Sequence, residues 1–502
     1  MIFYKSLSEN IKKFQDFSSV LSLVAKKYPN KIFIIEKKNQ ISFKDFDILV
    51  NQCCNFFLSL GLKKNDVISL YLDNSKEFLV LYFASMRYGT IVNPFPSSLA
   101  IEEVLIRAKF VKAKKIFLNK NKKSNLYYSI DSSFFLKFLK NFKNEFNIKQ
   151  QGKKIACLYY SSGTLGNPKI IEYSHSNIIS TQYSMNKKKF SNFFSRHLCL
   201  LPMGHTSALR YSVKQCVSTA STLIISDPFW KIRDKFWDII EKKKINFVQV
   251  VPTILNAIIN TKKKKNKKKN TLRFIGCGSS YLSPKLKDNF QKKFNVKVSN
   301  LYGLSEVGAT HFDDFRKNKK KNNCIGKPFS FVKVKFLNED KKEVGVCKEG
   351  EIAIKTPGMF SSYYKNKTLY KNSFYKDFFL TGDLGYRDFE GFHYLIDRKK
   401  NIIIKGGVNI EPEEINEVLL ASREVENAVT IGIPDKFYGE DMVSFIIPKK
   451  NFINLDKIKT FCISRLGEFK SPKEINIVKS FPVGPSGKVL LRFVKKDYLK
   501  QK

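Results

Sequence analysis

The sequence lacks the features of a secreted, disulfide-stabilised or membrane-spanning protein. Its nine cysteines form no CxxC pair and no His/Cys cluster, and Cys53 and Cys54 are adjacent, so no disulfide framework is indicated. No run of about 18 apolar residues occurs, which argues against a transmembrane segment. The N-terminal residues 1–14, MIFYKSLSENIKKF, carry charges too early for a secretory signal. We therefore expect a soluble cytoplasmic protein.

Acidic residues are scarce, with 44 Asp and Glu against 90 Lys and Arg, and the net charge is +46. Such an excess normally suggests nucleic acid or an anionic membrane surface as a partner. Arginine is also scarce, however, at 12 of the 90 basic residues, whereas a selected phosphate-binding face usually recruits it. The chain is rich in Lys, Asn, Ile and Phe, as A/T-rich coding sequences are. We interpret the run KKKKNKKKN, residues 262–270, as a solvated loop and expect no specific nucleic-acid partner.

The 502 residues exceed one ordinary hydrophobic core, so two or more domains are expected. Short apolar runs alternate with amphipathic helical patterns through about residue 390, a βαβ rhythm that predicts an α/β fold. From residue 324 to 355 the pattern changes to short antiparallel strands joined by charged turns. A second, smaller domain of about 100 residues is predicted to begin near Asp397.

One loop has the composition of a phosphate-binding site. Residues 161–169 read SSGTLGNPK, and small hydroxyl residues and glycines let backbone N–H groups approach a polyphosphate. Its two glycines, Gly163 and Gly166, are too close together for a Walker A loop. Alone, such a string is more often a surface turn. Two distant segments, YGLSE at 302–306 and TGDLGY at 381–386, raise the odds of a nucleotide site.

Further segments follow the same order as those of a known superfamily. They are PMGH at 202–205, GSSYLS at 278–283, NLYGLSEVG at 300–308, DRKKNIIIKGGVNIEPEEI at 397–415 and PSGK at 485–488. With the phosphate loop and TGDLGY, the chain resembles the adenylate-forming superfamily of acyl-CoA synthetases, aryl-CoA ligases, luciferases and peptide-synthetase adenylation domains. Seven elements in one order over nearly the whole chain carry this resemblance.

The resemblance implies an architecture and a reaction. The fold would be α/β, with an N-terminal adenylation domain at 1–396 made of stacked βα sheets, a barrel-like part at about 324–396, and a mobile α+β C-terminal domain at 397–502. The enzyme would activate a carboxylic acid with ATP and Mg²⁺ to an acyl-adenylate, releasing pyrophosphate, and transfer the acyl group to the thiol of CoA. Phosphopantetheine of an acyl carrier protein is the alternative acceptor. A catalytically degenerate nucleotide-binding protein is the alternative of another class, because Leu165 and Ile170 depart from the family's phosphate-loop pattern.

The resemblance also implies roles for single residues. Lys488 would neutralise charge between the carboxylate and the α-phosphate, Glu306 would hold Mg²⁺ together with Thr164, and His205 would act in the acid site. Asp383 would accept hydrogen bonds from the ribose hydroxyls, and Lys400 would be the hinge between two domain orientations. The full set of expected nucleotide-site and hinge residues is Ser161, Ser162, Gly163, Thr164, Gly166, Lys169, Gly278, Ser279, Ser280, Asn300, Tyr302, Gly303, Ser305, Asp383, Arg398, Lys400, Gly406 and Gly407.

The acid substrate is expected to carry no amine. No acidic residue lies between His205 and Cys216, where amino-acid-activating relatives place an aspartate. The acid pocket is predicted around His205, Cys277, Gly278 and residues 307–312. Its small, apolar residues suit a fatty or an aromatic acid.

Overall fold

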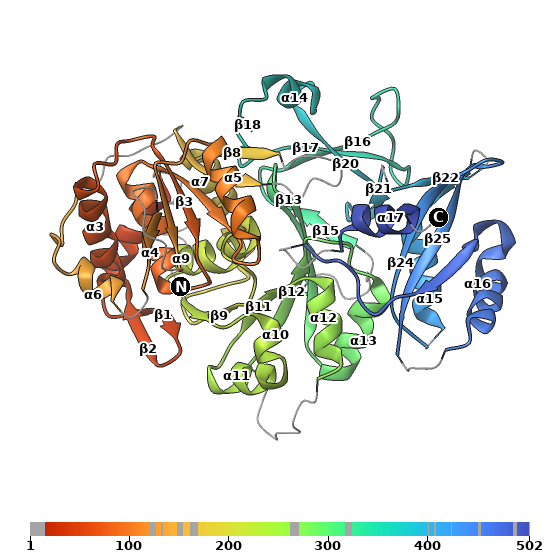
Figure 1. Cartoon of the computed structure of the whole chain (residues 1–502), viewed down its shortest axis with the longest axis horizontal. Helices are drawn as coiled ribbons and strands as arrows, with labels where there is room; N and C mark the ends of the chain where they lie inside the picture. The colour runs from red at the N-terminus through yellow and green to blue at the C-terminus, as the bar shows by residue number, and fades with distance from the viewer. Residues whose placement is uncertain are drawn as a thin grey trace.

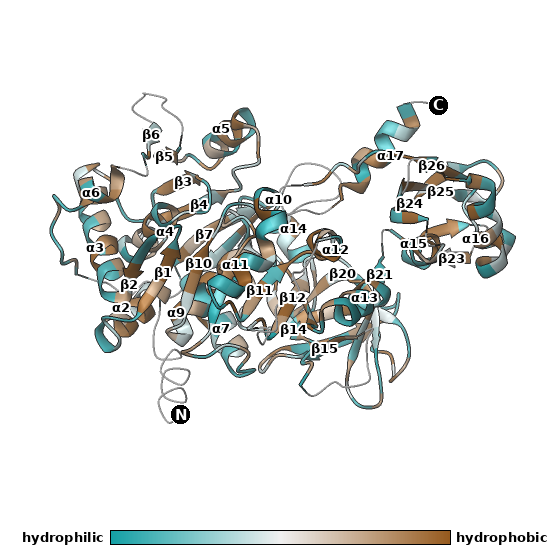
Figure 2. Cartoon of the chain, turned by 90° about the horizontal axis from the view of Figure 1, so that it is seen from below, coloured by the Kyte–Doolittle hydropathy of each residue, from teal (hydrophilic) through white to brown (hydrophobic). Residues whose placement is uncertain are grey.

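The computed structural model describes residues 16–119, 127–131, 134–147, 154–160, 169–261, 271–316, 324–399, 401–405, 408–422, 424–449, 453–484 and 489–500. Within these residues the chain forms three sheets with helices packed against them (Figure 1). The strands at the centre are predominantly hydrophobic, as Figure 2 shows. No described helix is both long and apolar enough to cross a membrane.

The first sheet has seven strands in the order β18-β8-β7-β4-β3-β5-β6. Strands β3 to β7 pair in parallel, while β8 and β18 are antiparallel additions at one edge. The predicted βαβ rhythm is confirmed here. The elements are β3 (Val67–Tyr71), α4 (Lys76–Tyr88), β4 (Ile91–Phe95), α5 (Ile101–Phe110), β5 (Lys115–Leu118), β6 (Tyr127–Ser129), α6 (Phe135–Leu139), β7 (Ile155–Tyr160), β8 (Ile170–Ser174) and β18 (Ser362–Tyr363).

The second sheet has 14 strands, of which β1, β10, β9, β11, β12 and β13 pair in parallel. Its strands in chain order are β1 (Ile32–Glu36), β2 (Asn39–Ser42), β9 (Arg196–Cys199), β10 (Thr222–Ile225), β11 (Phe247–Val250), β12 (Phe274–Gly278), β13 (Lys297–Leu304), β14 (Gly308–Phe312), β15 (Cys324–Pro328), β16 (Lys333–Leu337), β17 (Gly350–Lys355), β19 (Phe374–Tyr375), β20 (Phe378–Arg387) and β21 (His393–Arg398). The accompanying helices are α2 (Phe17–Lys27), α3 (Phe43–Ser59), α7 (His175–Asn186), α8 (Thr206–Ala208), η2 (Leu209–Lys214), α9 (Gln215–Thr219), α10 (Phe229–Ile232), η3 (Arg233–Lys235), α11 (Phe236–Lys242), α12 (Pro252–Ile259), α13 (Pro284–Phe294) and α14 (Lys367–Asn372).

The antiparallel strands predicted after residue 324 are present as an extension of this large sheet. Their order is β16-β17-β20-β21-β15, and β15 continues into β14. The barrel expected at about 324–396 is not confirmed, because β16 stands at the end of the strand order instead of pairing back onto the sheet.

The C-terminal part forms a third, five-stranded sheet in the order β23-β22-β25-β24, with β26 paired to β25. The region has its own buried core (Figure 2, far right). The elements are β22 (Ile403–Lys405), β23 (Val408–Ile410), α15 (Pro412–Ala421), β24 (Val425–Asp435), β25 (Gly439–Pro448), α16 (Leu455–Lys470), β26 (Glu474–Ile477) and α17 (Leu491–Lys500). The exact boundary at residues 396 and 397 stays a prediction.

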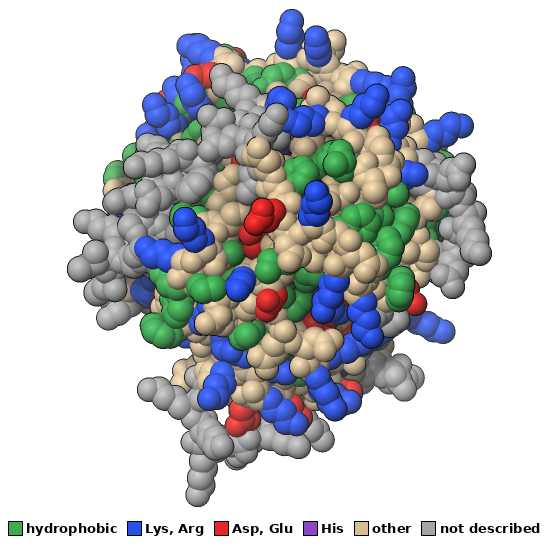
Figure 3. All heavy atoms as spheres, turned by 90° about the vertical axis from the view of Figure 1, so that its left-hand side faces the viewer, with side chains coloured by type: hydrophobic (Ala, Val, Ile, Leu, Met, Phe, Trp, Pro, Cys, Tyr) green, Lys and Arg blue, Asp and Glu red, His purple; other side chains and the backbone are tan. Residues whose placement is uncertain are grey.

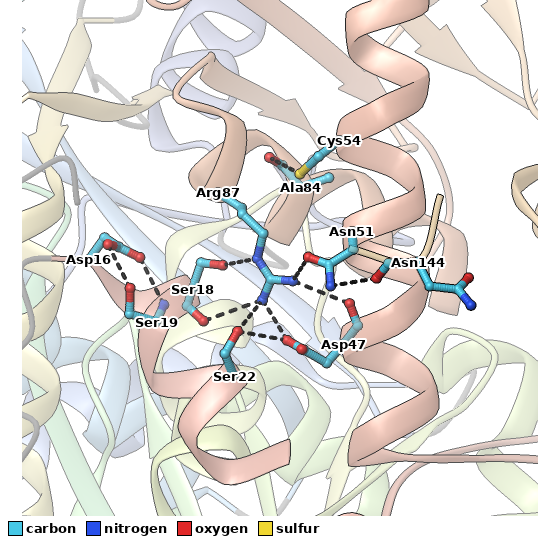
Figure 4. A network of polar contacts seen from close by, with 10 residues as sticks. All are labelled: Asp16, Ser18, Ser19, Ser22, Asp47, Asn51, Cys54, Ala84, Arg87 and Asn144. Carbon is cyan, nitrogen blue, oxygen red and sulfur yellow. Dashed lines mark hydrogen bonds and ion pairs between the residues drawn. The ribbon is translucent and has the colours of Figure 1, made fainter. Parts of the chain in front are cut away.

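A buried arginine connects the helices of the N-terminal part (Figure 4). The guanidinium of Arg87, on α4, donates to Ser18 Oγ and Ser22 Oγ, each at 2.8 Å, and to Asn51 Oδ1 and Asp47 Oδ1, each at 2.6 Å. Buried charges need such partners, because desolvation costs several kcal/mol per ion. The fold therefore provides Arg87 with both a carboxylate and neutral acceptors.

Candidate active site

The phosphate loop connects two paired strands. Strand β7 ends at Tyr160, β8 begins at Ile170, and the Cα atoms of these two residues are partners in the antiparallel register. Residues 161–168 lie outside the described residues, so the predictions for Ser161, Ser162, Gly163, Thr164 and Gly166 stay predictions, as does the effect of Leu165. Ile170 is buried in an apolar cluster with Leu158. Its side chain therefore packs in the hydrophobic core beside the sheet.

Three predicted nucleotide-site residues from three different strands meet. Tyr302 on β13 donates its hydroxyl proton to Asp383 Oδ2 at 2.7 Å, and Arg398 Nε, at the end of β21, lies 2.9 Å from Asp383 Oδ1. The register of β20 with β21 places Asp383 opposite Arg398. Burial and the neighbouring Asp383 carboxylate raise the pKa of Tyr302, and Asp383 raises the pKa of Arg398. The group is thus a neutral phenol, a carboxylate and a guanidinium in contact.

Glu306 lies in the turn between β13 and β14, beside this group. Tyr363 donates its hydroxyl proton to Glu306 Oε1 at 3.2 Å, and Tyr173 donates to the carbonyl oxygens of Ser305 at 2.8 Å and Glu306 at 3.2 Å. Burial raises the pKa of Glu306, while the positive charges of Lys169 and Arg398 lower it. Lys169 Nζ lies 5.3 Å from the centre of the Tyr363 ring. Glu306 is therefore near both the end of the phosphate loop and the Asp383 group.

The side chains around Glu306 suit a Mg²⁺ ion that is bound mainly by phosphate oxygens of the nucleotide. No group of three or more His, Cys, Asp or Glu side chains that could hold a metal occurs among the described residues. Mg²⁺ is commonly held by one or two carboxylates, with phosphate oxygens and waters completing its octahedron. Glu306 can supply such a carboxylate, and Thr164 lies outside the described residues.

Two glycines of the site are required by strand packing. A Cβ on Gly278 would lie 2.1 Å from the carbonyl oxygen of Leu301, and one on Gly303 would lie 2.1 Å from that of Gly308. These contacts are with backbone, which cannot move aside. Ser279 follows with a positive φ of 70°, and Ser280 comes next. Parallel pairing of β12 with β13 places Asn300 beside Cys277, so two of the segments expected to line the nucleotide site are neighbours.

His205 caps the helical segment that follows it. It is the N-cap residue of α8, and its Nδ1 accepts from the backbone N–H of Ser207 at 3.4 Å and lies 3.0 Å from Ser207 Oγ. A Cβ on Gly204 would lie 2.2 Å from the backbone of Phe95, which shows how closely this loop approaches the end of β4. Capping accounts for His205 structurally, and its role with the acid stays a prediction.

The structure reveals a positively charged hollow that was not predicted from the sequence, and one of its lining residues, Tyr173, contacts the Glu306 turn. Arg210 and Lys214, both on η2, line it together with Tyr159, Tyr173, Ile178, Thr181, Gln182 and Thr206. The hollow is partly open to solvent. A sequence signal did exist, because two basic residues four positions apart interrupt the mainly uncharged segment that follows His205.

The remaining predicted residues are in the C-terminal part. Lys400, Gly406, Gly407 and Lys488 lie outside the described residues. Lys405 is described and buried, and its Nζ lies 2.7 Å from Asp441 Oδ1.

Known proteins share both the sequence pattern and the fold. The family "AMP-binding enzyme" matches residues 21–364, and "AMP-binding enzyme C-terminal domain" matches residues 414–488. A sulfoacetate–CoA ligase of Cupriavidus necator is 26% identical, covering 95% of this chain and 96% of the relative. A long-chain-fatty-acid–CoA ligase of Bacillus subtilis is also 26% identical, covering 94% and 93%.

Solved structures of known proteins resemble this chain over almost its whole length. The ATP-bound MatB of Rhodopseudomonas palustris has a TM-score of 0.90 at 22% identity and covers 96% of this chain and 99% of its own. The o-succinylbenzoate CoA synthetase of Bacillus subtilis, in complex with the acyl-adenylate OSB-AMP, has a TM-score of 0.85 at 23% identity and covers 95% and 97%. Because the family match spans more than half of the residues, the chain belongs to the AMP-binding enzyme family.

Proposed function

We propose that this protein is an AMP-forming acid–thiol ligase that activates a fatty or aromatic carboxylic acid with ATP and transfers it to CoA. The observation that carries the proposal is the meeting of Tyr302, Asp383 and Arg398 beside Glu306, next to the strands that frame the phosphate loop. Relatives named as CoA ligases for sulfoacetate and for long-chain fatty acids support the acid and the acceptor.

In the first step, a carboxylate oxygen attacks the α-phosphorus of ATP, and the bond to pyrophosphate breaks. Two anions must approach each other, so the protein has to contribute alignment and positive charge. Asp383 offers oxygen lone pairs to the ribose hydroxyls, because a carboxylate has about four acceptor positions and only two are used here. Arg398 and Lys169 supply positive charge near Glu306. Mg²⁺, when bound at Glu306, would neutralise phosphate charge.

In the second step, the CoA thiol attacks the acyl carbon of the adenylate, and AMP leaves. We propose that rotation of residues 397–502 about Lys400 separates the two steps, withdrawing Lys488 and bringing the Gly406–Gly407 loop toward the site. Polar contacts between described residues join the two parts in this orientation. They include Tyr281 Oη to Glu417 Oε1 at 3.1 Å and Lys285 Nζ to the carbonyl oxygen of Leu420 at 2.9 Å.

We also propose a reducing, cytoplasmic location, because no disulfide joins any of the nine cysteines, all of which lie among the described residues. For the acceptor, phosphopantetheine on an acidic carrier protein is the second candidate. On the face shown in Figure 3, lysine and arginine side chains are scattered among apolar and neutral ones, with few acidic side chains. Such a surface favours encounter with acidic proteins. CoA is preferred because the named relatives are CoA ligases.

The test is ATP-dependent pyrophosphate release with Mg²⁺ over a panel of fatty, aryl and amino acids, with hydroxylamine to trap the adenylate. We expect release and a hydroxamate with a carboxylic acid, a thioester when CoA is added, and loss of release in Lys488→Ala. The exposed Lys242→Met, on α11, is the control and should match the wild type. Adenylate that only a carrier protein discharges would favour the second acceptor. No release with any acid would refute the ligase and favour a degenerate nucleotide-binding protein.

A further inference from the structure

Five lysine or arginine side chains in the described part of the chain are buried: Arg87, Arg210, Lys214, Lys287 and Lys405. Three of these have a carboxylate partner, namely Arg87 with Asp47 at 2.6 Å, Lys287 with Asp313 at 2.5 Å, and Lys405 with Asp441 at 2.7 Å. The remaining two, Arg210 (8% exposed) and Lys214 (6% exposed), form no ion pair with any described carboxylate. The fold thus leaves two neighbouring buried cations without an internal counter-charge.

The side chains that contact these two cations are tyrosines and a cysteine, with Arg210 close to the hydroxyl of Tyr173. Lys214 Nζ donates to Tyr82 Oη at 3.1 Å, and that hydroxyl also lies 2.9 Å from Tyr159 Oη and 3.5 Å from Cys157 Sγ. Burial, together with the nearby charge of Arg210 and against an opposing effect of Cys157, lowers the pKa of Lys214 to about 8. Arg210 cannot lose its proton in this way, because a guanidinium stays charged in proteins. At neutral pH the site therefore carries two positive charges.

The location of the pair connects it to the acid substrate. Both residues line the hollow that also contains Tyr173 and Thr206. Tyr173 contacts the Glu306 turn, Thr206 follows His205, and Tyr159 lies two residues before the phosphate loop. The hollow thus lies next to three predicted parts of the active site: His205 of the acid site, the Glu306 turn and the start of the phosphate loop. The two cations lie on a π-helical segment, a rare conformation that is frequent at functional sites.

We propose that this hollow binds a second anionic group of the substrate, so that the enzyme prefers fatty or aromatic acids carrying another carboxylate, or a similar anion, remote from the carboxylate that is adenylated. The inference rests on the proposed ligase function and specifies its substrate class. The substrate anion takes the place that Asp47, Asp313 and Asp441 occupy for the other buried cations. A neutral acyl chain would leave both charges unpaired.

The experiment compares each diacid with its own monomethyl ester, which has nearly the same shape but lacks the second charge. Suitable pairs are succinate, glutarate and terephthalate with their monomethyl esters, and hexanoate is added as a simple fatty acid. Pyrophosphate release gives kcat/KM for each. We expect kcat/KM for at least one diacid to exceed that for its monomethyl ester by about 10- to 100-fold, the range expected for charged hydrogen bonds.

Variants of Arg210 and Lys214 test whether these two side chains cause the preference for the diacid over its ester. Lys214→Met and Arg210→Met should each reduce kcat/KM for the diacid by about 10- to 100-fold, leave the ester within about twofold, and leave KM for ATP unchanged. The conservative Lys214→Arg and Arg210→Lys should keep most of the preference for the diacid, which excludes misfolding as the cause. Lys242→Met on the surface is the matched control for removal of a lysine.

The outcomes separate the inference from the function on which it rests. Adenylation of esters or hexanoate with no preference for any diacid would overturn the inference and leave the ligase intact. A rise in KM for ATP in both Met variants, equal for diacid and ester, would also overturn it, because the pair would then serve a nucleotide phosphate. No pyrophosphate release with any acid would overturn the ligase function itself.

Discussion

Lys214→Met should make the substrate-free protein more stable, although it removes a hydrogen bond. Burial lowers the pKa of Lys214 from 10.5 to about 8. A depression of this size corresponds to roughly 3 kcal/mol of lost folding free energy at pH 7. Removing the hydrogen bond to Tyr82 costs about 1 kcal/mol in return. Methionine fills a similar volume, so the variant should be more stable by about 2 kcal/mol.

The pH dependence of this gain has a definite sign. Below pH 8 the lysine is charged in both the folded and the unfolded protein, and the folded protein bears the full penalty. Between pH 8 and 10.5 the unfolded protein binds more protons, so wild-type stability rises with pH and the advantage of Lys214→Met shrinks. The assay is the thermal unfolding midpoint without ligands, which should rise by a few degrees at pH 7 and less at pH 9.5.

The matched comparison is Lys287→Met, also a buried lysine. Its removal leaves the Asp313 carboxylate buried without its cation, so this variant should be less stable than the wild type. A lower midpoint for Lys214→Met at pH 7 would refute the argument, because it would mean that the ammonium is compensated within the protein.

Four further predictions concern the site and the core. The KM for a diacid should rise about tenfold from pH 7 to pH 9, because Lys214, with a pKa of about 8, loses its charge and with it the attraction to the substrate. The monomethyl ester is the control, and a flat profile for the diacid would exclude Lys214 as its partner. Asp383→Asn should raise KM for ATP by about 10- to 100-fold, because it removes the charge opposite Arg398 and weakens an acceptor for ribose; an unchanged KM in steady-state kinetics would contradict the ribose role. Glu306→Gln should raise the Mg²⁺ concentration needed for half-maximal pyrophosphate release, with circular dichroism checking the fold, and identical Mg²⁺ titrations would disprove a metal role. Arg87→Met should destabilise the protein by about 3 to 5 kcal/mol, since Asp47 loses its buried partner, and an unchanged unfolding midpoint would show that the network in Figure 4 is not required.

The succession of strands, helices and motifs along the chain could be predicted from the sequence. Alternating apolar runs and amphipathic segments predicted the parallel βα arrangement, because sheet strands buried on both faces have few polar residues. The order of the motifs predicted the family, since the chemistry needs particular residue types at TGD and YGLSE. The barrel was predicted but is not confirmed, because whether antiparallel strands close depends on pairing at the far edge, which hydrophobic pattern does not specify.

The tertiary structure decided which distant residues act together. Tyr302 and Asp383 are 81 positions apart in the chain and meet only because β13 and β20 belong to one sheet. It also decided why Gly278 and Gly303 are glycines, since a neighbouring backbone carbonyl leaves no room for a Cβ.

The positive charge of the hollow is the clearest example of a property that only the tertiary structure decided. The sequence shows Arg210 and Lys214 as two of 90 cations, four positions apart in a mainly uncharged segment, but it does not show whether they are solvated or buried. Their significance depends on burial and on whether a carboxylate is near, and both properties belong to the surrounding elements. Sequence by itself determined the family and the residue types for chemistry on ATP. The folded chain decided where positive charge is left without a partner, because electrostatic compensation is a property of three-dimensional neighbours.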